Sequence, residues 1–254
     1  MKCNVSRFFL ACVFCLMTTG LIYGQKGLKL GIVALPQNTW MFNADDQAAP
    51  LDQFTYKTTF GMAAGPSFGY NFGENVGFRM NLLYSVQGQR YENKNSDGDW
   101  VEHTRRLHYL KLPVMVGFNT GGSYSKVMFS MYAGIQGGML TRARYYNDDQ
   151  SYTPDESLYD NVTDYPSTYR QYAMFDYGPV ADIGLDIKLT YNVQANIHFR
   201  GDYSLTDAER KNANYKLTEY GIPTTIPIYN PERATTTNFT GGIAVGLTYT
   251  IVNQ

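Results

Sequence analysis

The chain has 254 residues, and its 21 basic and 22 acidic side chains leave a formal net charge of −1. This balance excludes the strongly basic surface that nucleic-acid binding needs, and apart from a short leader the chain has about the length of one domain. All three cysteines (Cys3, Cys12 and Cys15) lie near the N-terminus, which excludes a disulfide framework or a cysteine metal site elsewhere. No apolar run approaches the ~20 residues of a transmembrane helix.

The first segment, Met1–Gly24, has the pattern of a secretory signal peptide. Lys2 and Arg7 supply its positive start, and its apolar stretch Phe8–Met17 is too short to span a bilayer. We expect this segment to be cleaved off, which leaves one domain over Gln25–Gln254.

Eight segments of strand length follow, and in each of them apolar and polar residues alternate. Successive side chains of a strand lie on opposite faces, so each segment has one apolar and one polar face. In chain order the expected strands are Leu28–Ala34 (extendable to Phe42), Lys57–Phe72, Val76–Tyr91, Arg105–Phe118, Lys126–Leu140, Tyr172–Leu189, Tyr191–Tyr203 and Thr237–Ile251. Pro66, Pro113 and Pro179 interrupt three strands, and we expect a bulge or bend at each because proline removes a ladder donor.

The charged residues of these strands gather on one face, and the central part of the other face carries none. An Arg or Lys that faces lipid at mid-bilayer costs roughly 2–4 kcal/mol, so this sorting is typical of a transmembrane barrel. A soluble ligand-binding barrel would place its apolar face inside. The polar face carries Arg79, Lys111, Asp176, Asp182, Asp186, Lys188, Arg200 and Asp202.

The connections between the strands are alternately long and short. The four long ones are Asn43–Tyr56, Glu92–Thr104, Ala143–Gln171 and Leu205–Thr236. The pattern predicts an all-β fold, an eight-stranded antiparallel transmembrane β-barrel of up-and-down topology in a bacterial outer membrane. Its N- and C-termini are then periplasmic, and the long loops lie outside the cell.

The sequence of the fourth strand gives the most specific resemblance to a known family. Leu107–Phe118, with its Tyr-Leu, Pro and Phe, is similar to the fourth strand of the PorT-like outer-membrane β-barrel family, which is common in Bacteroidota. Tyr132–Gly138 and Phe175–Gly184 resemble that family's fifth and sixth strands. The resemblance implies a fold and a location. One branch of the family serves protein secretion and gliding, so a subunit of such a machinery is an alternative function.

The last strand carries a second resemblance. Gly246, Tyr249 and Ile251 resemble the terminal signal that the barrel-insertion machinery reads, although the chain ends three residues beyond Ile251 and not in an aromatic residue. We therefore expect this machinery to be a partner.

The inward charges have a structural interpretation. Side chains fill a barrel of about eight strands, and buried charges must pair. We expect the four basic and four acidic inward residues to form a salt-bridge plug, and a narrow ion or proton path is the alternative.

Catalysis is not expected. The chain has only three histidines (His103, His108 and His198), and none is followed two residues later by a serine. We expect no catalytic, cofactor or metal site; a lipid A-modifying enzyme is the alternative. Asn93–Asp99 is similar to a calcium loop, but Thr104 stands where a bidentate Glu belongs, which favours a solvated turn.

Partners are expected at the long loops. Ala143–Gln171 and Leu205–Thr236 are rich in tyrosine, which suits a contact surface. The expected partners are outer-membrane lipid and lipopolysaccharide, the barrel-insertion machinery and an envelope-complex protein, with no nucleic acid.

Overall fold

The computed structural model describes residues 27–43, 54–73, 75–94, 100–121, 125–147, 156–157, 172–209 and 234–252. Within these ranges every regular element is a strand, and no helix is both long and apolar enough to cross a membrane. The signal-peptide prediction for Met1–Gly24 lies outside the described residues. The strands are β1 (Gly27–Phe42), β2 (Phe54–Lys57), β3 (Thr59–Asn71), β4 (Val76–Asn81), β5 (Leu83–Lys94), β6 (Trp100–Asn119), β7 (Val127–Asn147), β8 (Glu156–Ser157), β9 (Phe175–Lys188), β10 (Val193–Tyr203) and β11 (Thr237–Val252).

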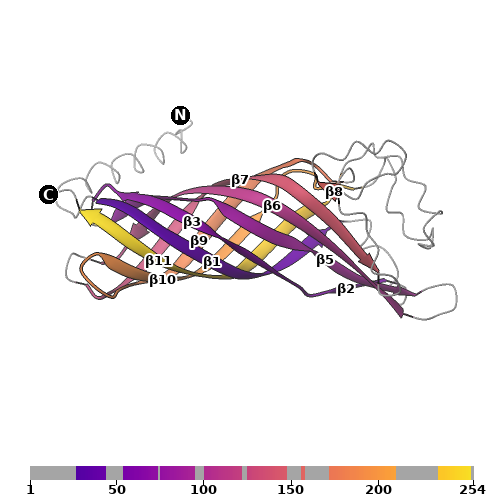
Figure 1. Cartoon of the computed structure of the whole chain (residues 1–254), viewed down its shortest axis with the longest axis horizontal. Coiled ribbons are helices and arrows are strands. Elements are labelled where there is room, and N and C mark those ends of the chain that lie inside the picture. The colour runs from indigo at the N-terminus through magenta and orange to yellow at the C-terminus, as the bar shows by residue number, and fades with distance from the viewer. Residues whose placement is uncertain are drawn as a thin grey trace, which may run out of the picture.

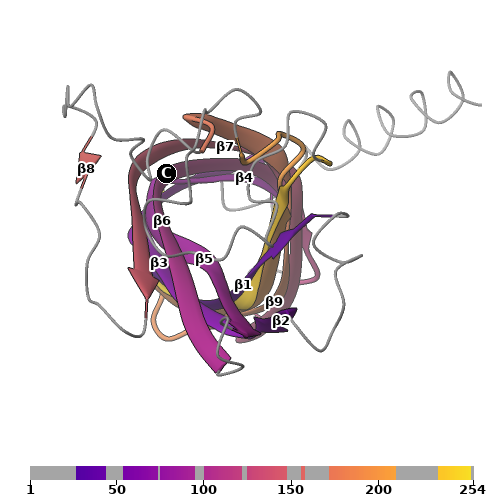
Figure 2. The ribbon, with the colours of Figure 1, turned by 90° about the vertical axis from the view of Figure 1, so that its right-hand side faces the viewer.

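The strands close into a barrel, as the view along its axis shows (Figure 2). Around the ring the order is β1, β3, β4 together with β5, β6, β7, β9, β10 and β11, and β11 pairs with β1 again. Every pairing between neighbours is antiparallel. The predicted eight-stranded antiparallel barrel is therefore confirmed, with β4 and β5 sharing one position, while the short β2 and β8 add to the sheet at its margins.

The two ends of the barrel differ (Figure 1). One end, here the short-turn end, holds the turns around residues 72–75, 120–126 and 189–192, together with Gly27 and Val252, which pair with each other. At the opposite end, here called the long-loop end, β1 ends at Phe42, β5 at Lys94 and β7 at Asn147, and β6 begins at Trp100. The prediction that the short-turn end is periplasmic stays a prediction.

One predicted loop is largely strand. Glu92–Thr104 was expected to be a long loop, but β5 and β6 stay paired as far as Lys94 and Trp100. An ion pair within this hairpin joins Arg90 to Glu102 at 3.3 Å, and another joins Glu92 to Lys57 of the neighbouring β2 at 2.9 Å. Beyond the apolar belt neither face of a strand needs apolar residues, so the polar composition that predicted a loop is compatible with a sheet. Residues 95–99, which include most of the calcium-like sequence, lie outside the described residues.

The expected bulges at the prolines are absent from the described strands. The register runs unbroken past Pro66, Pro113 and Pro179. Pro66 and Pro113 do, however, flank the break between β4 and β5 at Leu82, whose backbone N–H donates to the Pro66 carbonyl at 3.0 Å. Because neither proline offers an N–H donor to the strand between them, the ladder is interrupted there. The one register shift between β6 and β7 lies instead at Thr141, opposite His108 and Tyr109.

The barrel is apolar outside and polar inside. Large outward side chains are well exposed: Phe60 is 77% exposed, Ile135 72% and Phe199 67%. The inward positions on the same strands hold buried polar and charged groups, among them Lys111, Asp182 and Arg200. This arrangement agrees with the predicted faces, and it leaves the polar groups of the lumen to find their partners within the protein.

Candidate functional site

Strand register brings the charged residues of the lumen together. β9 and β10 place Asp182 directly opposite Arg200 and Asp186 directly opposite Asn196. β4 supplies Arg79 from the far side of the ring. Alternation along each strand turns all these side chains to the interior, because successive residues lie on opposite faces. Two charged clusters result, one around His198 and one around Asp202.

The strongest contact of the first cluster is a two-pronged ion pair. Arg200 donates from Nε to one carboxylate oxygen of Asp182 and from Nη2 to the other, each over 2.6 Å. Both side chains are almost fully buried. Bidentate pairs of this kind combine charge with fixed geometry, so the pair holds β9 and β10 in one register.

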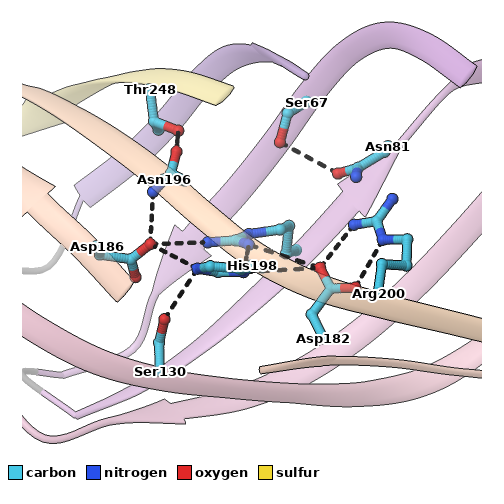
Figure 3. A network of polar contacts seen from close by, with 10 residues as sticks. Ser67, Asn81, Ser130, Asp182, Asp186, Asn196, His198, Arg200 and Thr248 are labelled. Carbon is cyan, nitrogen blue, oxygen red and sulfur yellow. Dashed lines mark hydrogen bonds and ion pairs between the residues drawn. The ribbon is translucent and has the colours of Figure 1, made fainter. Parts of the chain in front are cut away.

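His198 lies at the centre of the same cluster (Figure 3). Its Nε2 lies 2.9 Å from Oδ1 of Asp186 and 3.1 Å from Oγ of Ser130, and its Nδ1 lies 3.1 Å from Nη1 of Arg79. A guanidinium group can only donate, so Nδ1 accepts from Arg79 and the proton that we assign to Nε2 is donated to Asp186. Arg79 and His198 stand on opposite sides of the ring, so this contact spans the lumen.

Further groups complete the first cluster. Arg79 lies 3.8 Å from Asp182 and 3.7 Å from Asp186, and its Cζ lies 4.0 Å from the centre of the Tyr132 ring. Asn196 donates to Asp186 over 2.5 Å and accepts from Thr248 over 2.6 Å. The two carboxylates are therefore held by arginine, histidine and amide donors.

The second cluster lies nearer the long-loop end. Lys111 of β6 donates to Asp202 of β10 over 2.7 Å, and Gln136 of β7 donates to the same carboxylate over 3.0 Å. Thr240 of β11 donates to its other oxygen. Four strands are thus joined through one carboxylate across the interior.

Two of the eight predicted lumen charges do not join either cluster. Asp176 accepts hydrogen bonds from the hydroxyls of Ser204, at 2.5 Å, and Thr206, at 2.7 Å. Lys188 is the last residue of β9 at the short-turn end, near enough to Lys29 to act on it electrostatically. The structure therefore gathers six of the eight predicted charges in the two clusters, while Asp176 and Lys188 lie at opposite ends of β9.

Sequence reasoning missed several lumen groups. His198 was placed on the polar face but not at the centre of a cluster, because its importance comes from contacts with three other strands. Lys29 donates to Gln194 over 3.3 Å, and the alternation of the first strand could have identified it. Arg105 pairs with Glu209 over 2.8 Å. No strand pattern marked Glu209, because it lies beyond β10.

Apolar side chains pack inside the barrel beside the charged clusters and toward the long-loop end. Toward the long-loop end, buried residues from β1, β6 and β7 pack with two from segments 172–174 and 204–209; the set is Met41, Leu107, Tyr109, Leu140, Ala143, Tyr172 and Ala208. A smaller group, Met115, Tyr132 and Val180, packs beside the first cluster. The described interior is therefore filled at several levels.

The residues of the expected insertion signal lie on β11, where the ring closes. Gly246 pairs with Val33 of β1 and Asn196 of β10. Tyr249 and Ile251 point outward and are 49% and 43% exposed. Their recognition by the insertion machinery stays a prediction.

Comparison with known proteins agrees with this architecture. The model of a family described as "Outer membrane protein beta-barrel domain" matches residues 25–210. No curated protein matches the chain.

Solved structures of similar fold include Neisserial surface protein A, at 12% identity and a TM-score of 0.46, covering 87% of this chain and 96% of that one. OprG from Pseudomonas aeruginosa has 10% identity and a TM-score of 0.45, over 91% and 98%. Outer membrane protein W of E. coli has 14% identity and a TM-score of 0.40, over 89% and 98%.

Proposed function

The chain belongs to the outer membrane protein β-barrel domain family, and from this premise we propose that it is a closed, non-conducting and non-catalytic barrel that acts through its long-loop end. Its place is the bacterial outer membrane. We also propose that it falls within the PorT-like branch, on the fourth-strand sequence described above.

The observation that carries this proposal is the bonding across the lumen. Arg79 reaches His198 on the opposite side of the ring, and Lys111 reaches Asp202. A solute path through the interior would have to break these buried contacts, and removing one partner of a buried ion pair costs roughly 3–5 kcal/mol. The lumen is therefore better suited to rigidity than to transport.

The arrangement of Ser130, His198 and Asp186 supports a non-catalytic role. In a serine hydrolase the acid and the serine bind opposite nitrogens of the histidine ring. Here Ser130 and Asp186 share Nε2, while Nδ1 faces Arg79. Ser130 is also completely buried, so a substrate would have no access to its hydroxyl.

The long-loop end offers the surface that the lumen does not. β5, β6 and β7 continue there beyond the apolar belt, with β5 and β6 paired as far as Lys94 and Trp100. A rigid hairpin of this kind is a platform for contact with a protein partner of the cell envelope. Much of the tyrosine-rich segments Ala143–Gln171 and Leu205–Thr236 lies outside the described residues.

Two measurements test the proposal. Purified protein in planar lipid bilayers should give no steady conductance, whereas regular ion currents would favour the ion path and overturn the closed lumen. Protease added to intact cells should cleave within Ala143–Gln171 or Leu205–Thr236 and spare Gly73–Asn75 and Asn119–Ser125. Cleavage confined to the short turns would invert the proposed orientation.

A further inference from the structure

A long groove crosses the outer surface of the barrel. Its floor is a row of small side chains on four neighbouring strands, β7, β9, β10 and β11, which the strand register places side by side: Ala133, Ala181, Gly201 and Gly241. The row continues to Val116 of β6 at one end and to Asn38 of β1 at the other. The groove has a volume of about 1130 Å³, and we call it the outer groove.

Large apolar side chains stand on both sides of the outer groove. Each lies two positions from the floor along its own strand, and therefore on the same face of the sheet. Trp40 and Phe239 stand on the long-loop side, with their ring centres 5.4 Å apart. The residues on the short-turn side, all well exposed, are Met131, Ile183, Phe199 and Ile243. The outer groove therefore lies in the apolar belt and faces lipid.

The outer groove runs obliquely across this belt. Val116 lies near the short-turn end of β6, which ends at Asn119, whereas Asn38 lies toward the long-loop end of β1, which ends at Phe42. The row crosses six strands that are about 4.8 Å apart, so it is about 24 Å long. The hydrocarbon of one leaflet is about 15 Å thick. An acyl chain that descends from the long-loop side therefore fits along the groove.

The width of the outer groove favours a single chain over a helix. The two rows of large side chains are about 14 Å apart at the level of the backbone, and the side chains themselves occupy much of that distance. An α-helix, which is about 10–12 Å wide, cannot reach the floor between them. An acyl chain is only one methylene group wide, so it can lie on the small residues of the floor.

A polar side chain marks the end of the outer groove near the long loops. Asn38 lies opposite Gly241, and its outward neighbours along β1 are the apolar Pro36 and Trp40. Its side-chain oxygen is enclosed and has no hydrogen-bond partner among the described residues. A polar group without a partner in hydrocarbon is costly. Because tryptophan marks the boundary of the hydrocarbon, Asn38 lies at the depth where acyl chains begin.

We propose that the outer groove binds a 3-hydroxyacyl chain of lipid A, the acylated anchor of lipopolysaccharide, with Asn38 at the carbonyl end of the chain. The hydroxyl of the chain donates to the side-chain oxygen of Asn38, and the amide nitrogen of Asn38 donates to the carbonyl of the chain. The terminal torsion of asparagine is broad, so a turn of the amide presents both atoms to the groove. An ordinary phospholipid chain offers the carbonyl but no hydroxyl. This proposal rests on the proposed orientation, in which the long-loop end faces the lipopolysaccharide leaflet.

The fluorescence of Trp40 provides the test. Trp40 and Trp100 are the two tryptophans of the chain, so Trp100→Phe leaves Trp40 as the reporter in the groove. This protein is folded into vesicles of dibrominated phosphatidylcholine, whose bromine atoms quench tryptophan. Added lipid A should restore the fluorescence by more than its share of the lipid, because it displaces the brominated chain. We expect a preference of about fivefold over the brominated lipid, which corresponds to one hydrogen bond.

Two variants in this background remove the site in different ways. Gly201→Leu fills the floor, where an added Cβ would meet only the Thr240 carbonyl oxygen, at 3.9 Å, and Asn38→Leu removes the amide. Each should lose the preference for lipid A. Asn38→Leu carries the test if Gly201→Leu does not fold. The matched control is Gly137→Leu, which adds the same side chain further along the outer face of β7, where a Cβ meets nothing within 4 Å. It should keep the preference.

Two further probes separate the hydroxyl from the headgroup. 3-Hydroxytetradecanoic acid should restore the fluorescence more strongly than tetradecanoic acid, and phosphatidylethanolamine should do so only in proportion to its share of the lipid. The proposal is overturned if phosphatidylethanolamine matches lipid A, or if Asn38→Leu keeps the preference. Trp40 that brominated lipid does not quench would also overturn it, because a second copy of the protein would then cover the groove. Lipid A is present in both leaflets of these vesicles, so failure here is separate from failure of the protease test on cells.

Discussion

The charges inside the barrel and the outward charges of β6 and β7 follow different rules. Inside, Arg200 is matched with Asp182 and Lys111 with Asp202, each within 2.7 Å and almost without exposure. Outside, Arg106 stands opposite Arg144, and both carry the same sign. The buried groups need partners within the protein because they are almost fully removed from solvent. Outward groups are not enclosed by the barrel, so their partners need not lie on the strand directly opposite.

The largest expected effect comes from removing one partner of a buried ion pair inside the barrel. Asp182→Ala leaves the buried Arg200 without its bidentate partner, so we expect the free energy of unfolding to fall by about 3–5 kcal/mol. Urea unfolding of the protein folded in detergent, followed by gel mobility, measures it. Asp176→Ala is the matched control, because Asp176 contacts hydroxyls near the mouth, and it should lose about 1 kcal/mol. Equal urea midpoints for Asp182→Ala and the wild type would contradict the view that charges inside the barrel need a partner.

A smaller loss is expected in the second cluster. Lys111→Met removes the cation but leaves Asp202 with hydrogen bonds from Gln136 and Thr240. We expect a loss of about 2–3 kcal/mol. Adding Asp202→Asn should recover part of it, because the remaining buried charge is then gone. A double variant less stable than Lys111→Met would show that Asp202 does not depend on charge pairing.

The smallest effect is expected outside, and with the opposite sign. In lipid-free detergent Arg106→Gln removes a like-charged pair, so it should stabilise the fold by up to about 0.5 kcal/mol. The gain should shrink at about 0.5 M salt, where the Debye length is only a few ångströms. The same urea assay at low and high salt measures both. A loss of stability at low salt would show that a stabilising contact of Arg106 outweighs its repulsion from Arg144.

Much of the fold could be predicted because the membrane imposes a simple pattern. Alternation identified all eight barrel positions and the correct face for Lys111, Asp182 and Arg200. It failed where that constraint ends. The paired strands around Lys94 and Trp100 were predicted to be a loop, because outside the bilayer alternation is not required.

The site was predicted less well, because its geometry depends on contacts between distant strands. Nothing near His198 in the sequence indicates that Arg79 and Ser130 will reach its ring. Alternation also does not predict the bulge at Thr141, which turns Arg142 and Arg144 to the outer face. The prolines produced no register shift, although Pro66 and Pro113 flank the break in the ladder at Leu82.

The seam between β1 and β11 has a consequence for how the barrel is made. Gly27 pairs with Val252 and Phe42 with Thr237, so the closing ladder joins the two ends of the described chain. No part of this ladder can form until synthesis and export have delivered the last strand. Contacts between residues so distant in sequence are the slowest to form. Until then β1 and β11 are exposed edges, which are open to pairing with other chains. Protection of these two edges from other strands until they meet is therefore expected to favour correct closure of the barrel.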